Sequence, residues 1–340
     1  MTAASTLRTL AASDPLVFRR LRLDAASAPA ASLGGRWVGH AAAALTVPVL
    51  APALAPGAAV LDAWASGAAT QERQHGCVRY ATDGHWLHGC AEIDDRASGV
   101  HAGAHRAYAD LFEVLAADRC PHLLRLWNYI ADINRESGGV ERYRQFNAGR
   151  QQAFIEARRS AFEGSPAACA LGSRGGPLRV YFLAGCSAPL AIENPRQVSA
   201  YRYPASYGAR APTFSRAALA DVGGGRTALF ISGTASIVGH ATLHIGDVRR
   251  QAIESLANIA AVREAAAARA GVPFAAGELT YTLYLRRPDD LALVREVFEH
   301  AVGSASTAAR DAIYLHADIC RSALLVEIEA HGFARNGSTA

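Results

Sequence analysis

Residues 227–232 read TALFIS, and this short apolar run, which is followed by Gly233, predicts a buried strand. Downstream of it, residues 247–270 carry the pattern of a long helix. Gly271 and Pro273 follow that segment in the order that usually ends a helix. A strand followed by a long helix is therefore the first unit of the fold that the sequence predicts.

The C-terminal residues continue this alternation. Residues 278–285 alternate like a strand, residues 287–302 predict a second helix, and residues 324–330 predict a closing strand. The last third of the chain thus reads strand, helix, strand, helix, strand. We expect an α+β layer in which helices cover one face of a sheet.

Upstream of this layer, residues 178–184 form another apolar run typical of a buried strand. The segment 163–176 is rich in glycine and proline and predicts a linker or a long turn. Two domains are therefore expected, an N-terminal α+β domain over residues 1–165 and a C-terminal catalytic domain over residues 166–340. Within the first, a helical block is expected over residues 101–162, from the spacing of Leu111, Leu115, Leu123, Leu126 and Ile130.

The basic residues of this chain are all arginine. The 340 residues include 34 arginines and no lysine, which excludes Schiff-base and phosphate-loop chemistry that depends on lysine. Arginine recognises carboxylates through two parallel hydrogen bonds, so small anionic substrates suit this composition. The net charge of +4 is small for this length and shows no basic tract, so we expect no nucleic-acid partner.

The cysteines and one apolar stretch bear on the compartment. No C-x-x-C pair occurs, so reduced thiols in a cytoplasmic protein are expected. Residues 41–60 are almost wholly apolar, but three prolines interrupt them, and we expect buried strands and turns with no membrane span. The cysteines are Cys77, Cys90, Cys120, Cys169, Cys186 and Cys320, and the prolines are Pro48, Pro52 and Pro56.

Two carboxylates lie two residues apart on the expected closing strand. Glu327 and Glu329 leave the same face of a strand, because side chains alternate along it. If that face is partly buried, desolvation raises the pKa of at least one of them, and such an acid can deliver a proton near neutral pH. The alternative is a pair that faces solvent at the edge of the sheet.

The order of segments in the last third resembles the RidA/YjgF family, and longer strings resemble the chorismatase family. The RidA/YjgF features are LFISG (229–233), QAIESLANI (251–259) and VEIEA (326–330). The chorismatase features are WNYI (127–130), FNAGR (146–150), ENPRQVSAYRYP (193–204), SGTASIVGH (232–240) and DICRS (318–322). The second resemblance spans roughly residues 127–329 and is looser before them.

The resemblance implies a fold and an activity. It implies two RidA/YjgF-like (chorismate mutase-like) α+β domains with the active site in the cleft between them. The implied reaction splits chorismate into pyruvate and 3-hydroxybenzoate, with 4-hydroxybenzoate as a further product, and it needs no cofactor or metal. In the implied reaction Glu327 protonates the enolpyruvyl group. The resemblance associates Gly233 and Cys320 with aromatic products rather than with a dihydroxycyclohexadiene.

Chorismate carries two carboxylates, so its pocket must offer paired donors. The candidate substrate-binding residues are Arg150, Tyr201, Arg202, Tyr207, Arg210 and Arg216. Because Arg150 belongs to the first half, it places the pocket between the domains. Each of these arginines could instead form a structural ion pair.

Other interpretations stay open. A RidA-like enamine or imine hydrolase would use the same glutamate with an arginine for a carboxylate, and a non-catalytic protein could hold aromatic acids without turnover. His240 and His244 have the spacing of metal ligands, but no third ligand is evident nearby. A chain of this double length could close its cleft internally, so a monomer is compatible with the sequence.

Overall fold

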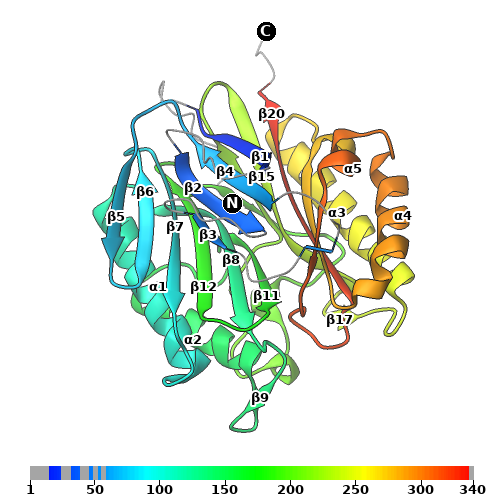
Figure 1. The fold of residues 1–340 in the computed structure, drawn as a ribbon, viewed down its shortest axis with the longest axis horizontal. Coiled ribbons are helices and arrows are strands. Elements are labelled where there is room, and N and C mark those ends of the chain that lie inside the picture. The colour runs from blue at the N-terminus through cyan, green and yellow to red at the C-terminus, as the bar shows by residue number, and fades with distance from the viewer. Residues whose placement is uncertain (1–14, 24–31, 39–45, 49–52, 55–58, 337–340) are drawn as a thin grey trace, which may run out of the picture.

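A computed structural model describes residues 15–23, 32–38, 46–48, 53–54 and 59–336. Two six-stranded sheets lie side by side, and each carries helices on the face that points away from the other (Figure 1). A smaller four-stranded sheet, built from the N-terminal residues, packs where the two large sheets meet. The chain therefore has the mixed α+β architecture expected from its C-terminal segments.

The first large sheet has the strand order β11-β8-β12-β7-β6-β5, in which only β11 and β8 pair in parallel. Helices α1 and α2 pack on its outer face, where their apolar side chains form one core with the sheet. Its strands and helices are β5 (Gln71–His75), β6 (Val78–Thr82), β7 (Trp86–Ile93), α1 (Gly99–Ala117), β8 (His122–Ala131), α2 (Arg142–Glu156), β11 (Ala167–Ser173) and β12 (Leu178–Gly185). Between β8 and α2, β9 (Glu136–Ser137) and β10 (Val140–Glu141) form a separate two-stranded hairpin.

The second large sheet has the order β13-β14-β15-β20-β18-β19, and helices α3, α4 and α5 cover its outer face. Its elements are β13 (Leu190–Ile192), β14 (Ala217–Asp221), β15 (Arg226–Ala235), α3 (Val248–Ala270), β18 (Thr280–Leu285), α4 (Leu291–Val302), α5 (Thr307–Asp311), β19 (Ile313–His316) and β20 (Val326–Arg335). A small hairpin, β16 (Ile237–Val238) and β17 (Ala241–Thr242), follows β15, and short 3₁₀ turns lie at Ala200–Arg202, Ala205–Tyr207, Ala276–Glu278 and Pro288–Asp290.

The N-terminal sheet has the order β1-β4-β2-β3, from β1 (Val17–Leu23), β2 (Ser32–Val38), β3 (Thr46–Pro48) and β4 (Ala59–Ala65). The apolar stretch 41–60 thus contributes β3 and the start of β4, and its residues 41–45, 49–52 and 55–58 lie outside the described residues. Among the helices of the described chain, none is long and apolar enough to cross a bilayer.

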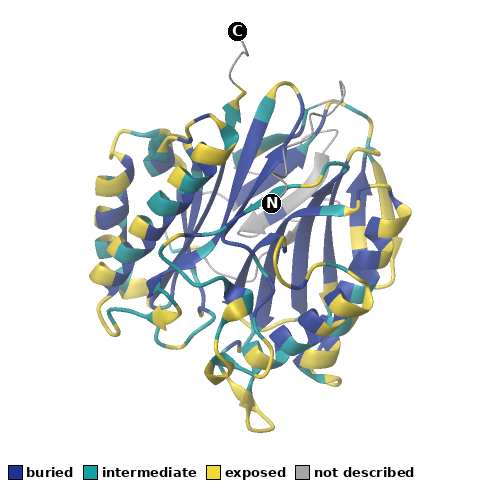
Figure 2. Cartoon of the chain, turned by 180° about the vertical axis from the view of Figure 1, so that it is seen from behind, coloured by how far each residue is buried: buried dark blue, intermediate teal, exposed yellow. Residues whose placement is uncertain are grey.

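The two large sheets face each other across a shared core. Trp127 and Tyr181 of the first sheet, Phe230 of the second and Trp64 of the N-terminal sheet belong to one buried cluster. Figure 2 shows most strands of the two large sheets buried, with the edge strand β5 and the outer faces of the helices exposed. This central layer, rather than either helical layer, is where side chains from all three sheets can meet.

The predicted C-terminal strands and helices are confirmed, and α5 and β19, which were not predicted, lie between α4 and β20. Asp247 caps α3 by accepting a hydrogen bond from the Arg250 amide, and Gly271 adopts the left-handed conformation that ends the helix. The helical block expected over residues 101–162 is wrong in its middle, because β8 separates α1 from α2. Residues 127–130 read WNYI, and aromatic and β-branched side chains favour a strand there.

The domain boundary expected at residues 165 and 166 does not coincide with the border between the two large sheets. β11 pairs with β8, and β12 lies between β7 and β8, so both strands belong to the first sheet. Gly175 and Gly176, both with positive φ, form the turn between these strands and not a linker. The first sheet ends at Gly185, and the second begins with β13.

Candidate active site

A cavity of about 450 Å³ lies between the two halves of the chain. Its walls come from the start of α2, from the loop between β13 and β14, from β15 with its hairpin, and from the segment that leads into β20. A volume of this size suits a small-molecule ligand. Residues from both halves line it, as expected for a site in the cleft between them.

Glu327 lies at the inner end of this cavity, on β20, with 3% of its surface exposed. Burial raises the pKa of Glu327 to about 8, the charge of Glu329 acts in the same direction, and Arg125 opposes both. The expected partly buried acid is therefore present, and the solvent-facing alternative is wrong. A carboxyl with this pKa is protonated at neutral pH and can act as a general acid.

Gly233 makes room for this carboxyl. A Cβ atom at Gly233 would lie 1.9 Å from Oε1 of Glu327 and 2.9 Å from Cβ of Cys169. The register between β15 and β20 shifts between Ile231 and Thr234, so Gly233 lies at an irregularity of the ladder. Only glycine lets the two strands and the carboxyl occupy this space together.

Cys320 lines the cavity beside the acid, and its Sγ donates to Oε2 of Glu327 at 3.8 Å. Burial, together with the nearby Glu327, raises the pKa of the Cys320 thiol to about 12. The thiol therefore stays protonated at neutral pH. A protonated thiol at this position can donate a hydrogen bond or relay a proton, but it is a poor nucleophile.

Arg216 supplies a buried cation to the same cavity. One of its terminal nitrogens donates to the hydroxyl of Tyr203 at 2.7 Å and to the carbonyl of Val198 at 2.9 Å. Its Nε is buried and has no hydrogen-bond partner among the described residues. A buried N–H group without a partner can donate a hydrogen bond to an anionic ligand that enters the cavity.

Arg321 and Tyr207 form the outer part of the site. The guanidinium of Arg321 stacks 4.1 Å from the ring centroid of Tyr207 and 5.1 Å from that of Tyr203. Arg321 also donates to the carbonyl of His240 and to the hydroxyl of Thr242, which belong to the hairpin after β15. These contacts hold a second cation at the cavity.

The predicted substrate-binding residues divide into two groups. Tyr207 and Arg216 line the cavity, whereas Tyr201, Arg202, Arg210 and Arg150 do not. The side chain of Arg202 is exposed, and Arg210 borders a separate cavity of about 270 Å³. The 3₁₀ turns of this loop send neighbouring side chains in different directions, so nearness in the sequence does not bring all of them to one pocket.

Arg150 lies behind the cavity wall. It is buried, it donates to Oδ1 of Asn147 at 2.9 Å, and its guanidinium lies 5.1 Å from the ring of Phe146. Its charge acts on Tyr143, which lines the cavity and whose pKa burial raises. Arg150 therefore lies next to a residue that lines the cavity without lining the cavity itself.

Several lining residues were not assigned a role from the sequence. Arg321 and Tyr203 belong to the quoted strings, and Tyr143 lies three residues before one of them, but only the folded chain shows that they share a wall. The signal for Arg321 was its position next to Cys320. The spacing from Tyr143 to Arg321 is too long for any pattern to join them.

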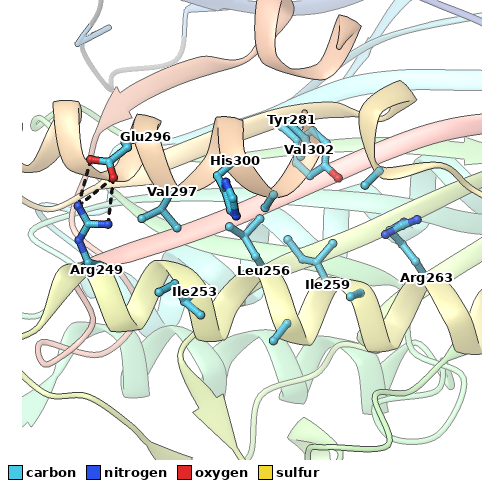
Figure 3. Close-up of a pocket in the computed structure, with 14 residues that line it drawn as sticks. Arg249, Ile253, Leu256, Ile259, Arg263, Tyr281, Glu296, Val297, His300 and Val302 are labelled. Carbon is cyan, nitrogen blue, oxygen red and sulfur yellow. Dashed lines mark hydrogen bonds and ion pairs between the residues drawn. The ribbon is translucent and has the colours of Figure 1, made fainter. Parts of the chain in front are cut away.

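A second hollow is larger, about 590 Å³, and lies between α3 and α4 (Figure 3). Its walls are mostly aliphatic, and its ion pair, Arg249 with Glu296, is exposed and satisfies its own charges. Arg263 donates to the carbonyl of Phe274. No buried acid faces this groove from the described residues that line it, so the smaller cavity is the better candidate for an active site.

Known proteins resemble this chain over most of its length. The family model described as "Chorismatase FkbO/Hyg5-like, N-terminal" matches residues 62–184. A 3-hydroxybenzoate synthase from Streptomyces hygroscopicus is 39% identical over 302 residues, which cover 85% of this chain and 85% of that protein. A chorismatase from Streptomyces rapamycinicus is 36% identical and covers 79% of this chain and 80% of that protein.

A solved structure agrees with the sequence comparison. A crystal structure of a chorismatase matches with a TM-score of 0.81 at 28% identity, over 95% of this chain and 99% of that one. A RidA protein from an Antarctic Psychrobacter species covers 43% of this chain and 99% of its own, with 20% identity and a TM-score of 0.31. The fold is that of a chorismate-cleaving enzyme, and its cavity holds a buried carboxyl. The chain belongs to the chorismatase family.

Proposed function

We propose that this enzyme cleaves chorismate to pyruvate and 3-hydroxybenzoate. The observation that carries the proposal is the buried, protonated carboxyl of Glu327 at the end of a cavity that also holds Arg216. The relatives named 3-hydroxybenzoate synthase and chorismatase support the same substrate and product. The imine-hydrolase and ligand-binding alternatives have no comparable support from named relatives.

Glu327 acts as the general acid in this proposal. It transfers its proton to the terminal methylene carbon of the enolpyruvyl group, which becomes the methyl group of pyruvate. The positive charge that develops at the enol-ether carbon weakens the bond between the ether oxygen and the ring. The neighbouring ring hydroxyl attacks that ring carbon as pyruvate leaves, and its proton returns to the carboxylate of Glu327. The resulting epoxide opens at its other carbon, and loss of a ring proton then gives 3-hydroxybenzoate. With a pKa of about 8, Glu327 carries the necessary proton at neutral pH.

The two carboxylates of chorismate need separate cations. Arg216 is buried and has an unused Nε donor, whereas Arg321 is half-buried at the outer part of the cavity. An anion that enters this cavity can therefore replace its lost hydration with charge-assisted hydrogen bonds from both guanidiniums. Tyr203 and Tyr207 hold these two side chains in position.

The aromatic product depends on excluding water. Pyruvate and a hydroxybenzoate together contain the same atoms as chorismate, whereas the dihydroxycyclohexadiene requires one added water. Gly233 leaves no side chain between the substrate and Glu327, and Cys320 places a protonated thiol beside it. Close contact between the ring and these groups leaves little space for water.

Incubation of the purified enzyme with chorismate tests this proposal. We expect pyruvate and 3-hydroxybenzoate in equal amounts, resolved by liquid chromatography with an enzymatic pyruvate assay. A share of 4-hydroxybenzoate would extend the product assignment, and the diene would contradict the roles given to Gly233 and Cys320. Absence of pyruvate would contradict the whole proposal and favour an assay of imine hydrolysis.

We further propose that the enzyme works as a cytoplasmic monomer. One chain supplies every residue of the cavity, and all six cysteines are free, which suits a reducing compartment. Gel filtration with light scattering should give the mass of a single chain. A stable trimer would contradict the assignment.

A further inference from the structure

Strand β20 carries two carboxyls into one buried space, and they have different surroundings. Glu327 and Glu329 are 3% and 4% exposed, and both leave the same face of the strand. Two neighbouring carboxylates in a buried space of low dielectric constant repel each other strongly, so one of them keeps a proton. The partners of each carboxyl decide which one that is.

Glu329 has the partners of an ionised carboxylate. Its Oε2 accepts from a guanidinium nitrogen of Arg125 at 2.5 Å, and its Oε1 accepts from two nitrogens of Arg36, each at 3.2 Å. The hydroxyl of Tyr284 donates to the same Oε1 at 2.9 Å. Two cations and a hydroxyl donor thus hold the negative charge in place.

Glu327 has no such partners. Within the described part of the chain it forms no ion pair, and its one hydrogen bond comes from the thiol of Cys320. The other titratable groups that face it are Glu329 on its own strand, Arg125 from β8 and the thiol of Cys169 from β11. Tyr284 lies opposite it on β18. Only one of these groups is a cation, and that cation is already paired with Glu329.

We propose that Glu329 is a positioning residue for the general acid: fixed as a carboxylate between Arg125 and Arg36, it keeps the proton of the pair on Glu327. The proton therefore stays on the carboxyl that reaches the cavity. The raised pKa of Glu327, with the opposing contribution of Arg125, fits this division. Burial acts to raise the pKa of Glu329 as well, but Arg36 and Arg125 outweigh it and hold that pKa below its usual value.

The three sheets cooperate in this arrangement. Arg36 comes from the N-terminal sheet, Arg125 from the first large sheet and Glu329 from the second. Arg36 is itself held by Asp62 at 3.2 Å and by the hydroxyl of Tyr129 at 3.0 Å. The charge that controls the acid is thus fixed where all three sheets meet.

A kinetic test rests on the proposed chorismate cleavage. Wild-type kcat/KM should fall only as the pH rises through about 8, because the protonated acid is lost there. In Glu329→Gln the like charge is gone, so Glu327 ionises at lower pH, and kcat/KM at pH 8 relative to pH 6 should fall by a further factor of roughly ten. Glu329→Asp keeps the charge and should keep the alkaline limb near its wild-type position.

A change in Glu329→Gln that lowers kcat/KM by one factor at every pH would overturn the proposal, because it would indicate a structural role alone. An alkaline limb of the Glu329→Gln pH profile that stays at the wild-type pH would also overturn the proposal. Both variants should first show wild-type circular dichroism, so that only folded enzyme is compared.

A second readout needs neither turnover nor a variant of Glu329. Infrared difference spectra detect the carbonyl band of a buried protonated carboxyl, and we expect this band in the wild type at pH 7 with loss near pH 8. Glu327→Gln should abolish it while Glu329 is still present. A band lost near pH 8 that persists in Glu327→Gln would show that Glu327 does not carry this proton and would overturn the proposal, even if chorismate proves not to be the substrate.

Discussion

The contact between Gly233 and Glu327 governs where the acid can point. The carboxyl occupies the volume that a side chain at position 233 would fill, since a Cβ there would lie 1.9 Å from Oε1. Any larger residue must move the acid or move the strand. The position of the proton donor is therefore set by the absence of a side chain on the neighbouring strand.

Gly233→Ala should lower kcat by about 100-fold, because a displacement of the acid by about 1 Å misaligns proton transfer. The product mixture should shift from 3-hydroxybenzoate toward the diene. Chromatography of the products measures both effects.

Gly332→Ala is the matched control. Its Cβ would lie 2.3 Å from Cδ2 of Leu279, so it overpacks β20 away from the cavity. Both substitutions should cost about 1–3 kcal/mol of unfolding free energy. Equal losses of kcat in the two variants would contradict the role given to Gly233.

Glu327 also makes the fold sensitive to pH. Its folded pKa of about 8 exceeds the ordinary value of 4.5, so the stability it contributes is complete below pH 4.5 and is lost as the pH rises through 8. Glu327→Gln removes this dependence. The stability of the variant relative to the wild type should therefore increase as the pH rises from 4.5 to 8, and the gain should be roughly 2–4 kcal/mol at pH 9.

Urea denaturation of the wild type and of Glu327→Gln at pH 5 and pH 9 measures this difference. Glu264→Gln, on the exposed face of α3, is the control and should follow the wild type at both pH values. A difference that shrinks toward high pH would contradict the raised pKa.

Single residues could be predicted where chemistry and local pattern agree. The alternation of a strand places Glu327 and Glu329 on one face, and the structure confirms a buried acid there. The sequence could not show that Arg36 and Arg125 select Glu329 as the ionised partner, because they lie 293 and 204 positions away from it. Contacts at such separations follow from the packing of sheets and leave no local pattern.

At the scale of elements, the N-terminal sheet is tied to the second large sheet by buried charge. Asp62 on β4 accepts from Nε of Arg20 at 2.6 Å and from Arg36 at 3.2 Å. Arg20 in turn donates to the carbonyl of Tyr281 on β18 at 2.6 Å. The carboxylate of Asp62 thus organises the cations that join these sheets.

Asp62→Asn should lower the free energy of unfolding by about 3 kcal/mol at pH 7, because it leaves buried guanidiniums without their counter-charge. Burial by itself raises the pKa of Asp62, but Arg20 and Arg36 bring it below 3.8. Its contribution is therefore present above pH 3.8 and is lost as the pH falls through the folded pKa, so the variant and the wild type should converge in acid.

Urea titrations at pH 7 and at pH 3 check this expectation. Asp94→Asn, in an exposed pair with Arg96, serves as the control and should leave the transition unchanged. A constant difference between Asp62→Asn and the wild type at both pH values would contradict the assigned ionisation.

Helices with capping residues at both ends were predicted well, whereas a strand that is buried on both faces was not. Helix α3 has a capping aspartate at 247 and a left-handed glycine at 271, and its bounds match the expectation. β8 was assigned to a helix, because Leu123, Leu126 and Ile130 are also compatible with helical spacing. A strand buried on both faces loses the alternation that identifies strands.

At the scale of the whole molecule, two layered halves enclose the site. The first sheet supplies Arg125, the second supplies Glu327, and the N-terminal sheet supplies Arg36 to the charge network behind the acid. The expected boundary at residues 165 and 166 missed this arrangement, because turn residues within a sheet resemble those of a linker. The family model, which ends at residue 184, agrees with a first sheet that ends at Gly185.

The central claim is that the carboxyl of Glu327 delivers the proton that releases pyruvate. Pyruvate formation from chorismate by Glu327→Gln and by the wild type tests it most directly, with chorismate binding measured by calorimetry in both. We predict binding within a few-fold of the wild type and a loss of kcat of at least about 100-fold, because the amide cannot replace the acid. Pyruvate release at a wild-type rate by Glu327→Gln would contradict the account.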